Sequence, residues 1–216
     1  MQASRAWAYA TLVCSVLIGL WFFWGVRMSQ VEQPKYTVIA KAGTIEVRQY
    51  PAMIVAEVQV EGVRQRAIRE GFKLLADFIF GNNHLQKQVA MTAPVQQQST
   101  TIAMTAPVQQ QASQAGWWVR FVMPSAYTMA TLPQPNNKAV KVRVVPEAQY
   151  VVIRFSGLAS HQRMADQRAK LAQYVEAHNL SVHGMPVYAF YNPPWTLPFF
   201  RRNEIMLALT QSNRGH

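Results

Sequence analysis

Cysteine is almost absent from this 216-residue chain, because the single one, Cys14, lies inside a long apolar run. The remainder of the chain therefore has no disulfide, no thiolate nucleophile and no cysteine-based metal site. A cysteine-free domain is compatible with either a reducing or an oxidising compartment, so the redox environment stays open. Charge is also scarce: charged residues make up 14% of the chain and hydrophobic residues 50%. This composition excludes a disordered chain and fits one packed globular domain.

Acidic residues are the scarcer kind of charge. The chain has 21 lysines and arginines against 10 aspartates and glutamates, a net charge of +11, and most of the excess lies after residue 35. A basic surface suits phosphates, anionic lipid head groups, nucleic acid or ligand carboxylates, and it also promotes solubility. Charge alone does not choose among these. Because no recognised nucleic-acid motif is present, we expect no nucleic-acid partner.

The usual catalytic motifs are missing. The sequence has no G-x-S-x-G, no glycine-rich phosphate loop and no H-E-x-x-H. No two histidines form an i, i+4 pair, and the five-residue spacing of His178 and His183 is a weak metal signal, so metal ligands stay unassigned. We expect a protein that is not an enzyme. The competing enzyme hypothesis requires a buried carboxylate, and Glu204 is the first candidate.

The N-terminal run 6–26 contains no charged residue, and about 20 such residues can cross a bilayer as a helix. Its aromatic residues lie towards the two ends, as membrane interfaces favour. A cleaved signal peptide is the competing interpretation, but no small-x-small site follows the run. We therefore expect an uncleaved single-pass membrane anchor and linker over 1–35. Flanking positive charges are nearly balanced, and the short N-terminal tail favours a domain on the extracytoplasmic (periplasmic) side.

The remaining 36–216 are expected to form one domain with alternating strands and helices. Apolar residues recur at helical spacing over 62–80, as Ile68, Phe72, Leu75 and Ile79, and over 160–179, as Met164, Leu171 and Val175. Short β-prone runs lie at 36–40, 45–50, 53–60, 117–123, 140–145, 150–155, 185–191 and 204–209. In 53–60 apolar residues at 54, 56, 58 and 60 alternate with polar ones at 57 and 59, which predicts a strand with one buried face. Short turns join most strands, and we expect 140–145 to pair with 150–155 across one of them. The fold class is therefore α+β, an antiparallel sheet with two packed helices preceded by one transmembrane helix.

A short internal repeat lies between the first predicted helix and the strand at 117–123. Residues 89–98 read VAMTAPVQQQ, and 102–111 repeat them as IAMTAPVQQQ. The spacing is too short for a solenoid unit. Two β-prone runs around 99–101 instead predict a hairpin formed by the two copies.

Apolar and aromatic residues gather near arginines in two places. The helix over 62–80 offers Phe72, Leu75, Ala76 and Ile79 beside Arg69, although such a stripe is also typical of ordinary core. The proline-rich loop 192–200 contains three aromatics and is followed directly by two arginines; its candidate residues are Trp195, Thr196, Phe199, Arg201 and Arg202. A planar apolar ligand with carboxylate arms requires this combination, because burial supplies affinity and guanidinium groups pair with carboxylates.

Eight segments of the sequence resemble the SOUL haem-binding family, in the family's order. They are IEVRQY (45–50), AIREGF (67–72), the two MTAPV copies, FVMPS (121–125), LPQP (132–135), RFSG (154–157), YNPP (191–194) and RRNE (201–204). The resemblance spans about 36 to 209. It implies the gyrase-inhibitor-like fold, a distorted, barrel-like antiparallel sheet with two helices, built from pseudo-repeated strand-helix-strand-strand units.

The resemblance also implies non-covalent binding of haem or another porphyrin in a shallow hydrophobic cleft between the first helix and the loop before the last strand. By position, Arg69, Phe72, Leu75 and Ala76 would line the helix side, and Thr196 with its neighbours the loop side. Two departures concern the charges and the iron. Some members have a histidine where this chain has Gln49, and others a lysine near Thr196, so axial histidine ligation is not expected and Arg201 or Arg202 supplies the positive charge.

Met91 and Met104 are the other residues able to ligate iron, although a methionine in a strand is more often part of the core. The leading hypothesis is a binding protein for tetrapyrrole transport, buffering or delivery at a membrane. A small-molecule sensor and a hydrolase on the same fold are the alternatives. The physiological ligand, the iron ligand and the oligomeric state stay open.

Overall fold

The computed structural model describes residues 31–100 and 116–210. The elements, in chain order, are β1 (Thr37–Ala42), β2 (Ile45–Tyr50), β3 (Met53–Glu61), α2 (Arg64–Ile79), β4 (Val95–Thr100), β5 (Gly116–Val122), β6 (Lys141–Val145), β7 (Ala148–Phe155), α3 (His161–Ala177), β8 (Val182–Phe190), the single 3₁₀ turn η2 (Pro198–Phe200) and β9 (Asn203–Leu209). The expected α+β class is confirmed.

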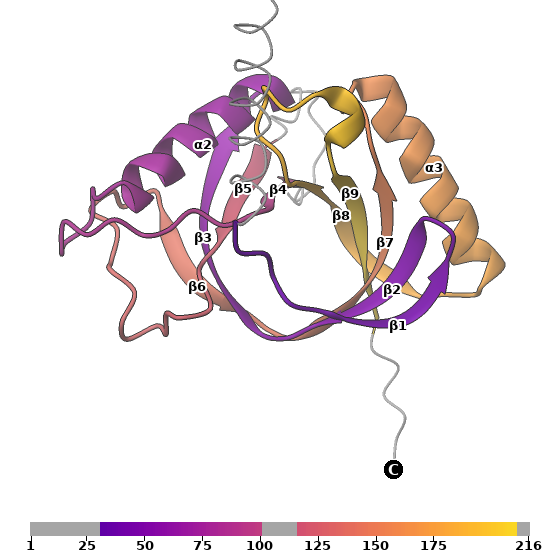
Figure 1. The fold of residues 1–216 in the computed structure, drawn as a ribbon, viewed down its shortest axis with the longest axis horizontal. Coiled ribbons are helices and arrows are strands. Elements are labelled where there is room, and N and C mark those ends of the chain that lie inside the picture. Colours follow the sequence, from indigo (N-terminus) through magenta and orange to yellow (C-terminus); the bar gives the residue numbers. More distant parts are fainter. Residues whose placement is uncertain (1–30, 101–115, 211–216) are drawn as a thin grey trace, which may run out of the picture. The chain divides into compact units, whose positions relative to one another are not determined.

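All nine strands form one antiparallel sheet in the order β1-β2-β7-β9-β8-β4-β5-β3-β6. The sheet is strongly curved, and α2 and α3 lie outside the curve (Figure 1). Among the described residues it is open rather than closed as a barrel, because β1 and β6 each have a neighbouring strand on one side only. The order is symmetric about the β8–β4 pair: β7-β9-β8 on one side matches β3-β5-β4 on the other, and each triplet carries one helix.

The expected pairing of β6 with β7 is wrong. The two strands occupy nearly the predicted residues, but β6 pairs with β3 and β7 pairs with β2 and β9. A short connection normally favours a hairpin. Here each half of the sheet instead pairs with a strand that belongs in sequence to the other half. The strand β2, which precedes β3 in the chain, joins β7, and the strand β6, which precedes β7, joins β3.

The strand β3 is buried on both faces, although its alternation predicted one buried face. Ala56 and Val58 pack under α2 as expected. On the opposite face Val55 is buried, and so is Glu57, with 4% of its surface exposed. Glu57 is buried because two arginines neutralise it: Arg120 donates from Nε at 2.5 Å and Arg143 from Nε at 2.7 Å.

Both helices pack on the same face of the sheet, called the helix face. Residues paired directly across neighbouring strands point to the same face of a sheet. The pairs that begin under α2, on β3, continue through β5, β4, β8 and β9 to the residues of β7 under α3, so both sets lie on one face. In α2 the buried stripe is Ala67, Gly71, Leu75, Phe78 and Ile79. Leu75 and Ile79 were predicted, whereas in the first half of the helix the buried residues lie one position before the predicted Ile68 and Phe72. A Cβ on Gly71 would lie 2.6 Å from Val119 Cγ2, so glycine allows this close approach.

The second helix follows its prediction more closely. Met164 and Leu171 are buried, and the Ser160 side chain accepts a hydrogen bond from the backbone N–H of Arg163 at the helix N-terminus. None of the helices among the described residues is long and apolar enough to cross a bilayer, and the expected anchor 6–26 lies outside those residues.

The pairing of β4 does not agree with the expected hairpin between the two repeat copies. This strand includes residues 95–98 of the first copy, and its two neighbours are β5 and β8. Before it, the Thr92 hydroxyl donates to the Val122 carbonyl, and the Ala93–Pro94 peptide is cis. The second copy, 102–111, lies outside the described residues.

The inner face of the curve is crossed by residues 32–36, called the strap (Figure 1). At its start, Glu32 accepts hydrogen bonds from the backbone N–H groups of Ala93 and Ser125. At its end, the Tyr36 ring lies 4.2 Å from the Arg48 guanidinium carbon. The strap therefore contacts both halves of the sheet and covers part of the inner face.

Candidate functional site

Three partly exposed aromatic rings lie on the helix face over the centre of the sheet. Trp117 comes from β5, and Tyr188 and Phe190 come from β8. The register places all three on the same side as the intervening β4 residues, because Trp117 pairs with Ser99, Tyr188 with Gln97 and Phe190 with Val95. We call this set the aromatic floor.

Arg64, the first residue of α2, lies over the aromatic floor. Its guanidinium carbon is 5.8 Å from the Trp117 ring centroid and 5.6 Å from those of Tyr188 and Phe190. Its Nη2 donates to Gln97 Oε1 at 2.8 Å, whereas its buried Nε–H has no acceptor among the described residues. Arg64 also pairs with no carboxylate among them.

This arrangement leaves an uncompensated positive charge on an apolar surface. Burial lowers the pKa of Arg64 from its ordinary value, although the partial negative charge of Tyr188 opposes this. The aromatic faces give the cation part of the stabilisation that water would provide. A flat apolar ligand with an acidic arm would bury the rings and supply the acceptor that Nε–H lacks.

The sequence predicted Arg69 rather than Arg64 as the cation of this helix. Arg69 is exposed. Phe72 is 39% exposed and meets Phe121 edge-on, with ring centroids 5.3 Å apart, so it borders the same face. Leu75 is fully buried in the core and cannot contact a ligand without opening that core, and Ala76 is half-buried. The available sequence signal was helical spacing: Arg64 precedes the buried Ala67 and Gly71 by three and seven positions, which places it on their side of the helix.

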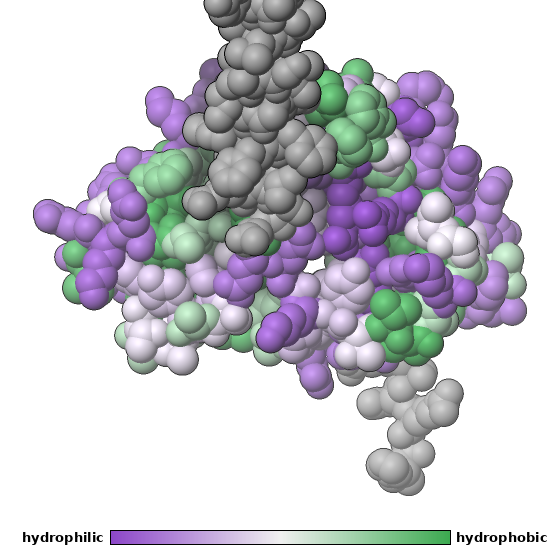
Figure 2. Space-filling model, viewed as in Figure 1, coloured by the Kyte–Doolittle hydropathy of each residue, from purple (hydrophilic) through white to green (hydrophobic). Residues whose placement is uncertain are grey.

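The loop between β8 and β9 carries three strongly exposed aromatic side chains close together in sequence. Trp195, Phe199 and Phe200 are each about two-thirds exposed, at 66%, 65% and 67%. Leu158, in the loop between β7 and α3, is 55% exposed, and the two loops are joined where the Gly157 N–H donates to the Pro198 carbonyl at 2.8 Å. We call these four residues the aromatic tip. Figure 2 shows hydrophobic surface over the η2 segment of this tip.

Arg201 and Thr196 brace the tip rather than face a ligand. The Arg201 Nε donates to the Thr196 carbonyl at 2.7 Å, and its Nη2 donates to the Pro194 carbonyl. Arg201 has no carboxylate partner among the described residues. Arg163 covers Gly157, since its Nη1 lies 2.6 Å from where a Cβ on that glycine would be.

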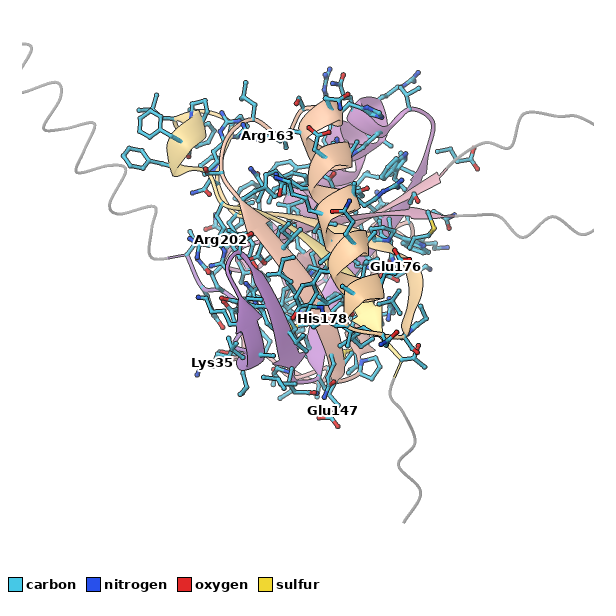
Figure 3. All side chains as sticks on the ribbon, turned by 90° about the vertical axis from the view of Figure 1, so that its right-hand side faces the viewer. Lys35, Glu147, Arg163, Glu176, His178 and Arg202 are labelled. Atoms are coloured by element: carbon cyan, nitrogen blue, oxygen red, sulfur yellow. The ribbon has the colours of Figure 1, made fainter. Side chains whose placement is uncertain are left out.

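The structure does not bring the two predicted halves of the site together. Figure 3 shows η2 projecting at one side of the folded unit, well apart from α2. The tip residues Trp195, Phe199 and Phe200 therefore form one surface, and Phe72 with Arg64 borders another. The two are connected through the chain, since Phe190 of the floor ends β8 and leads into the loop.

Arg202, the other predicted loop cation, belongs to a buried ionic network on the inner face. Glu204 is 1% exposed. It accepts hydrogen bonds from Arg48 Nη1 and Nη2 at 3.0 and 3.1 Å, from Arg202 Nε at 2.9 Å and from the Tyr191 hydroxyl at 2.8 Å. Arg202 Nη2 makes a further ionic contact with it at 2.8 Å. Gln33 and Tyr36 of the strap accept hydrogen bonds from the same Arg202.

The network keeps its members in one protonation state. Burial opposes the charge on Arg48 and Arg202, but Glu204 more than offsets this and raises the pKa of both guanidiniums. Burial and the Glu204 charge raise the pKa of Tyr191, and together they raise the pKa of Tyr50 to about 12. Every lone pair of Glu204 is occupied by a donor, so this carboxylate has no free position to accept a substrate proton.

The residues considered as iron ligands are not part of the floor. Gln49 lies on β2 and donates to the Tyr50 carbonyl, and Met91 is exposed just before β4. Met104 lies outside the described residues. His84 contacts the backbone of Gln134, and no group of three or more histidine, cysteine or acidic residues is arranged for a metal within 31–100 and 116–210.

A separate pocket of about 440 Å³ lies between the strap, the β2–β3 turn and residues 122–129. Its lining is mostly apolar and includes Met53, Ile54, Met123 and Met129. None of the predicted site residues lines it.

Comparisons with known proteins agree with the fold. Residues 31–208 match the sequence model of the SOUL heme-binding protein family. Among solved structures, the C-terminal domain of EcmrR has 13% identity and a TM-score of 0.56, with 82% of this chain and 99% of that one covered. An uncharacterized conserved protein from Listeria innocua has 14% identity and a TM-score of 0.56, covering 79% and 94%. A hydrolase from Listeria innocua has 15% identity and a TM-score of 0.55, covering 80% and 94%. No curated protein matches.

Proposed function

Because the chain belongs to the SOUL haem-binding family, we propose that it binds haem or a related porphyrin non-covalently on the aromatic floor. The observation that carries this site is Arg64, a half-buried arginine over three partly exposed rings, whose buried Nε–H has no acceptor within 31–100 and 116–210. The rings of Trp117, Tyr188 and Phe190 offer the macrocycle a surface to stack on, and Arg64 offers one of its carboxylates a partner.

The floor contains no histidine, cysteine or methionine to ligate haem iron, and we assign its tyrosine, Tyr188, to stacking rather than to ligation. Haem bound there would bring redox and ligand-exchange chemistry, while this chain's residues would bind and orient the ring. Affinity would then come from stacking and charge pairing, and haem and metal-free porphyrin would bind with similar strength. A carrier or buffer that releases its ligand readily fits this arrangement better than an enzyme does.

We place this activity at a membrane. The uncharged run 6–26 is long enough to anchor the chain, and the folded unit begins a few residues later, at Glu32. With the short N-terminal tail in the cytoplasm, the domain would lie on the extracytoplasmic side and transport, store or deliver tetrapyrrole there.

The test is a titration of the full chain with haem and with metal-free porphyrin, followed by tryptophan fluorescence and absorbance. Replacing Arg64 with methionine removes the charge but keeps an apolar side chain, and should weaken binding by roughly tenfold to a hundredfold, as expected for a lost charge-assisted hydrogen bond. Arg69→Met, on the exposed side of the same helix, is the matched control and should bind normally.

A porphyrin dimethyl ester, which has no carboxylate, should bind the Arg64→Met variant and the unchanged chain alike. Because replacing a poorly compensated buried charge with an apolar residue is often neutral or stabilising, circular dichroism should show no loss of stability. An unchanged tryptophan signal with both ligands would refute the proposal. Equal affinity of the Arg64→Met and Arg69→Met variants would refute the site.

A further inference from the structure

The aromatic tip exposes four large apolar side chains close together on the folded unit. Figure 3 shows η2 projecting from the body of the folded unit, whereas ligand sites are usually concave. A projecting cluster with tryptophan and phenylalanine fits a soft, flat partner better than a small molecule. We propose that the aromatic tip inserts into the interface of an anionic lipid bilayer and fixes the orientation of the domain on it.

The tip is held in its projecting conformation. Arg201 donates to two carbonyls of its own loop, Gly157 donates to Pro198, and the Asn203 amide donates to the Gly157 carbonyl at 3.0 Å. These bonds satisfy the backbone of both loops at the base of the tip. Trp195, Phe199 and Phe200 are therefore presented outward without a further ordering penalty on docking.

The charges around the tip complement an anionic surface. Arg163 and Arg201 lie at its base, and the two loop segments 156–163 and 191–201 contain no acidic residue. Cations beside interfacial aromatics are the arrangement that binds anionic head groups while the rings enter the boundary with the acyl chains.

The N-terminal part of the chain limits how far the tip can be from a bilayer. Only residues 27–31 separate the apolar run 6–26 from the strap, and a chain spans at most about 3.6 Å per residue. In the strap, Gln33 accepts a hydrogen bond at 3.0 Å from Arg202, which lies two residues after Phe200 of the tip. If 6–26 is the anchor proposed above, the tip lies beside the point where the folded unit is tethered.

The test attaches a single label to the protein, which is possible because Cys14 is the only cysteine in the sequence and can be replaced. In a Cys14→Ser background, Phe199→Cys carries an environment-sensitive fluorophore, and the control is Glu147→Cys, at an exposed turn far from η2 (Figure 3). Each full-length protein is reconstituted into vesicles of phosphatidylcholine with phosphatidylglycerol, with and without spin-labelled lipid. Flotation of the vesicles measures anchoring separately.

We expect both labelled proteins to float with the vesicles. The label at position 199 should shift its emission to the blue and should lose intensity when spin-labelled lipid is present. The label at position 147 should show neither change. Quenching at 199 should weaken in vesicles of phosphatidylcholine alone. A label at 199 that behaves like the one at 147 would overturn the inference. So would one that responds to porphyrin but not to lipid, which would make the tip a ligand site, or one that changes with protein concentration, which would make it a contact between copies. Protein that does not float would show that neither the anchor nor the tip binds the bilayer, which would also overturn the inference while leaving the porphyrin titration intact.

Discussion

Replacing Glu204 with glutamine would test whether one carboxylate holds the inner face together. Four hydrogen bonds from Arg48, Arg202 and Tyr191 converge on it, and Arg202 Nη2 adds an ionic contact. Glutamine keeps the shape but removes the charge, and its amide N–H₂ would face guanidinium N–H groups where an acceptor is needed. Removing one partner of a buried ion pair costs about 3–5 kcal/mol, because the other charge is left uncompensated.

That loss is large compared with the total stability of a domain, which is about 5–15 kcal/mol. For a chain of this length, the melting temperature should fall by on the order of 10 °C. Thermal and urea unfolding followed by circular dichroism would measure both quantities. Glu147→Gln, at the exposed turn between β6 and β7, is the matched control and should change the free energy of unfolding by no more than about 0.5 kcal/mol.

The opposite result would be equally informative. If Glu204→Gln were as stable as Glu147→Gln, the carboxylate would not be the structural centre that its contacts indicate. A Glu204→Gln protein that kept normal stability but lost a chemical activity would favour the hydrolase hypothesis. The saturated hydrogen bonding of Glu204 argues against that outcome.

Two further predictions concern the other half of the sheet. The guanidiniums of Arg143 and Arg120 lower the pKa of Glu57 despite its burial, so its contribution to stability is complete above its ordinary value of 4.5 and is lost as the pH falls through the lower folded-state value. Unfolding curves between pH 7 and pH 2 should show this acid-side loss, and it should be smaller in Glu57→Gln, whereas parallel pH profiles would contradict it. Gly71→Ala should lower stability by about 1–3 kcal/mol in urea unfolding, because the new methyl group meets Val119 across the α2–β5 contact; an unchanged midpoint would show that α2 can shift outward freely.

Much of the fold was predictable because local patterns carry it. The alternation in 53–60 predicted which residues of β3 pack under α2, and the spacing in α3 predicted Met164 and Leu171 as its buried positions. Strand partners were not predictable in the same way. The short β6–β7 connection favours a hairpin locally, and only the tertiary structure shows that β6 joins β3 and β7 joins β2.

The candidate site shows the same division between local and distant information. That aromatics and arginines would matter was visible in the sequence, and Phe72 and the 192–200 loop were named from it. That Arg48 would neutralise Glu204 was not visible, because the two are 156 residues apart. Arg64 was missed because the rings that it faces, on β5 and β8, are distant from it in the sequence.

The exchange of strands between the two halves of the sheet affects how the chain can be made. During synthesis β2 emerges about a hundred residues before its neighbour β7, and β3 must wait until β6 has emerged to have both neighbours. An incomplete chain therefore carries unprotected strand edges, which readily pair with other chains. A truncated product ending before β6 would be expected to aggregate rather than to form half a domain.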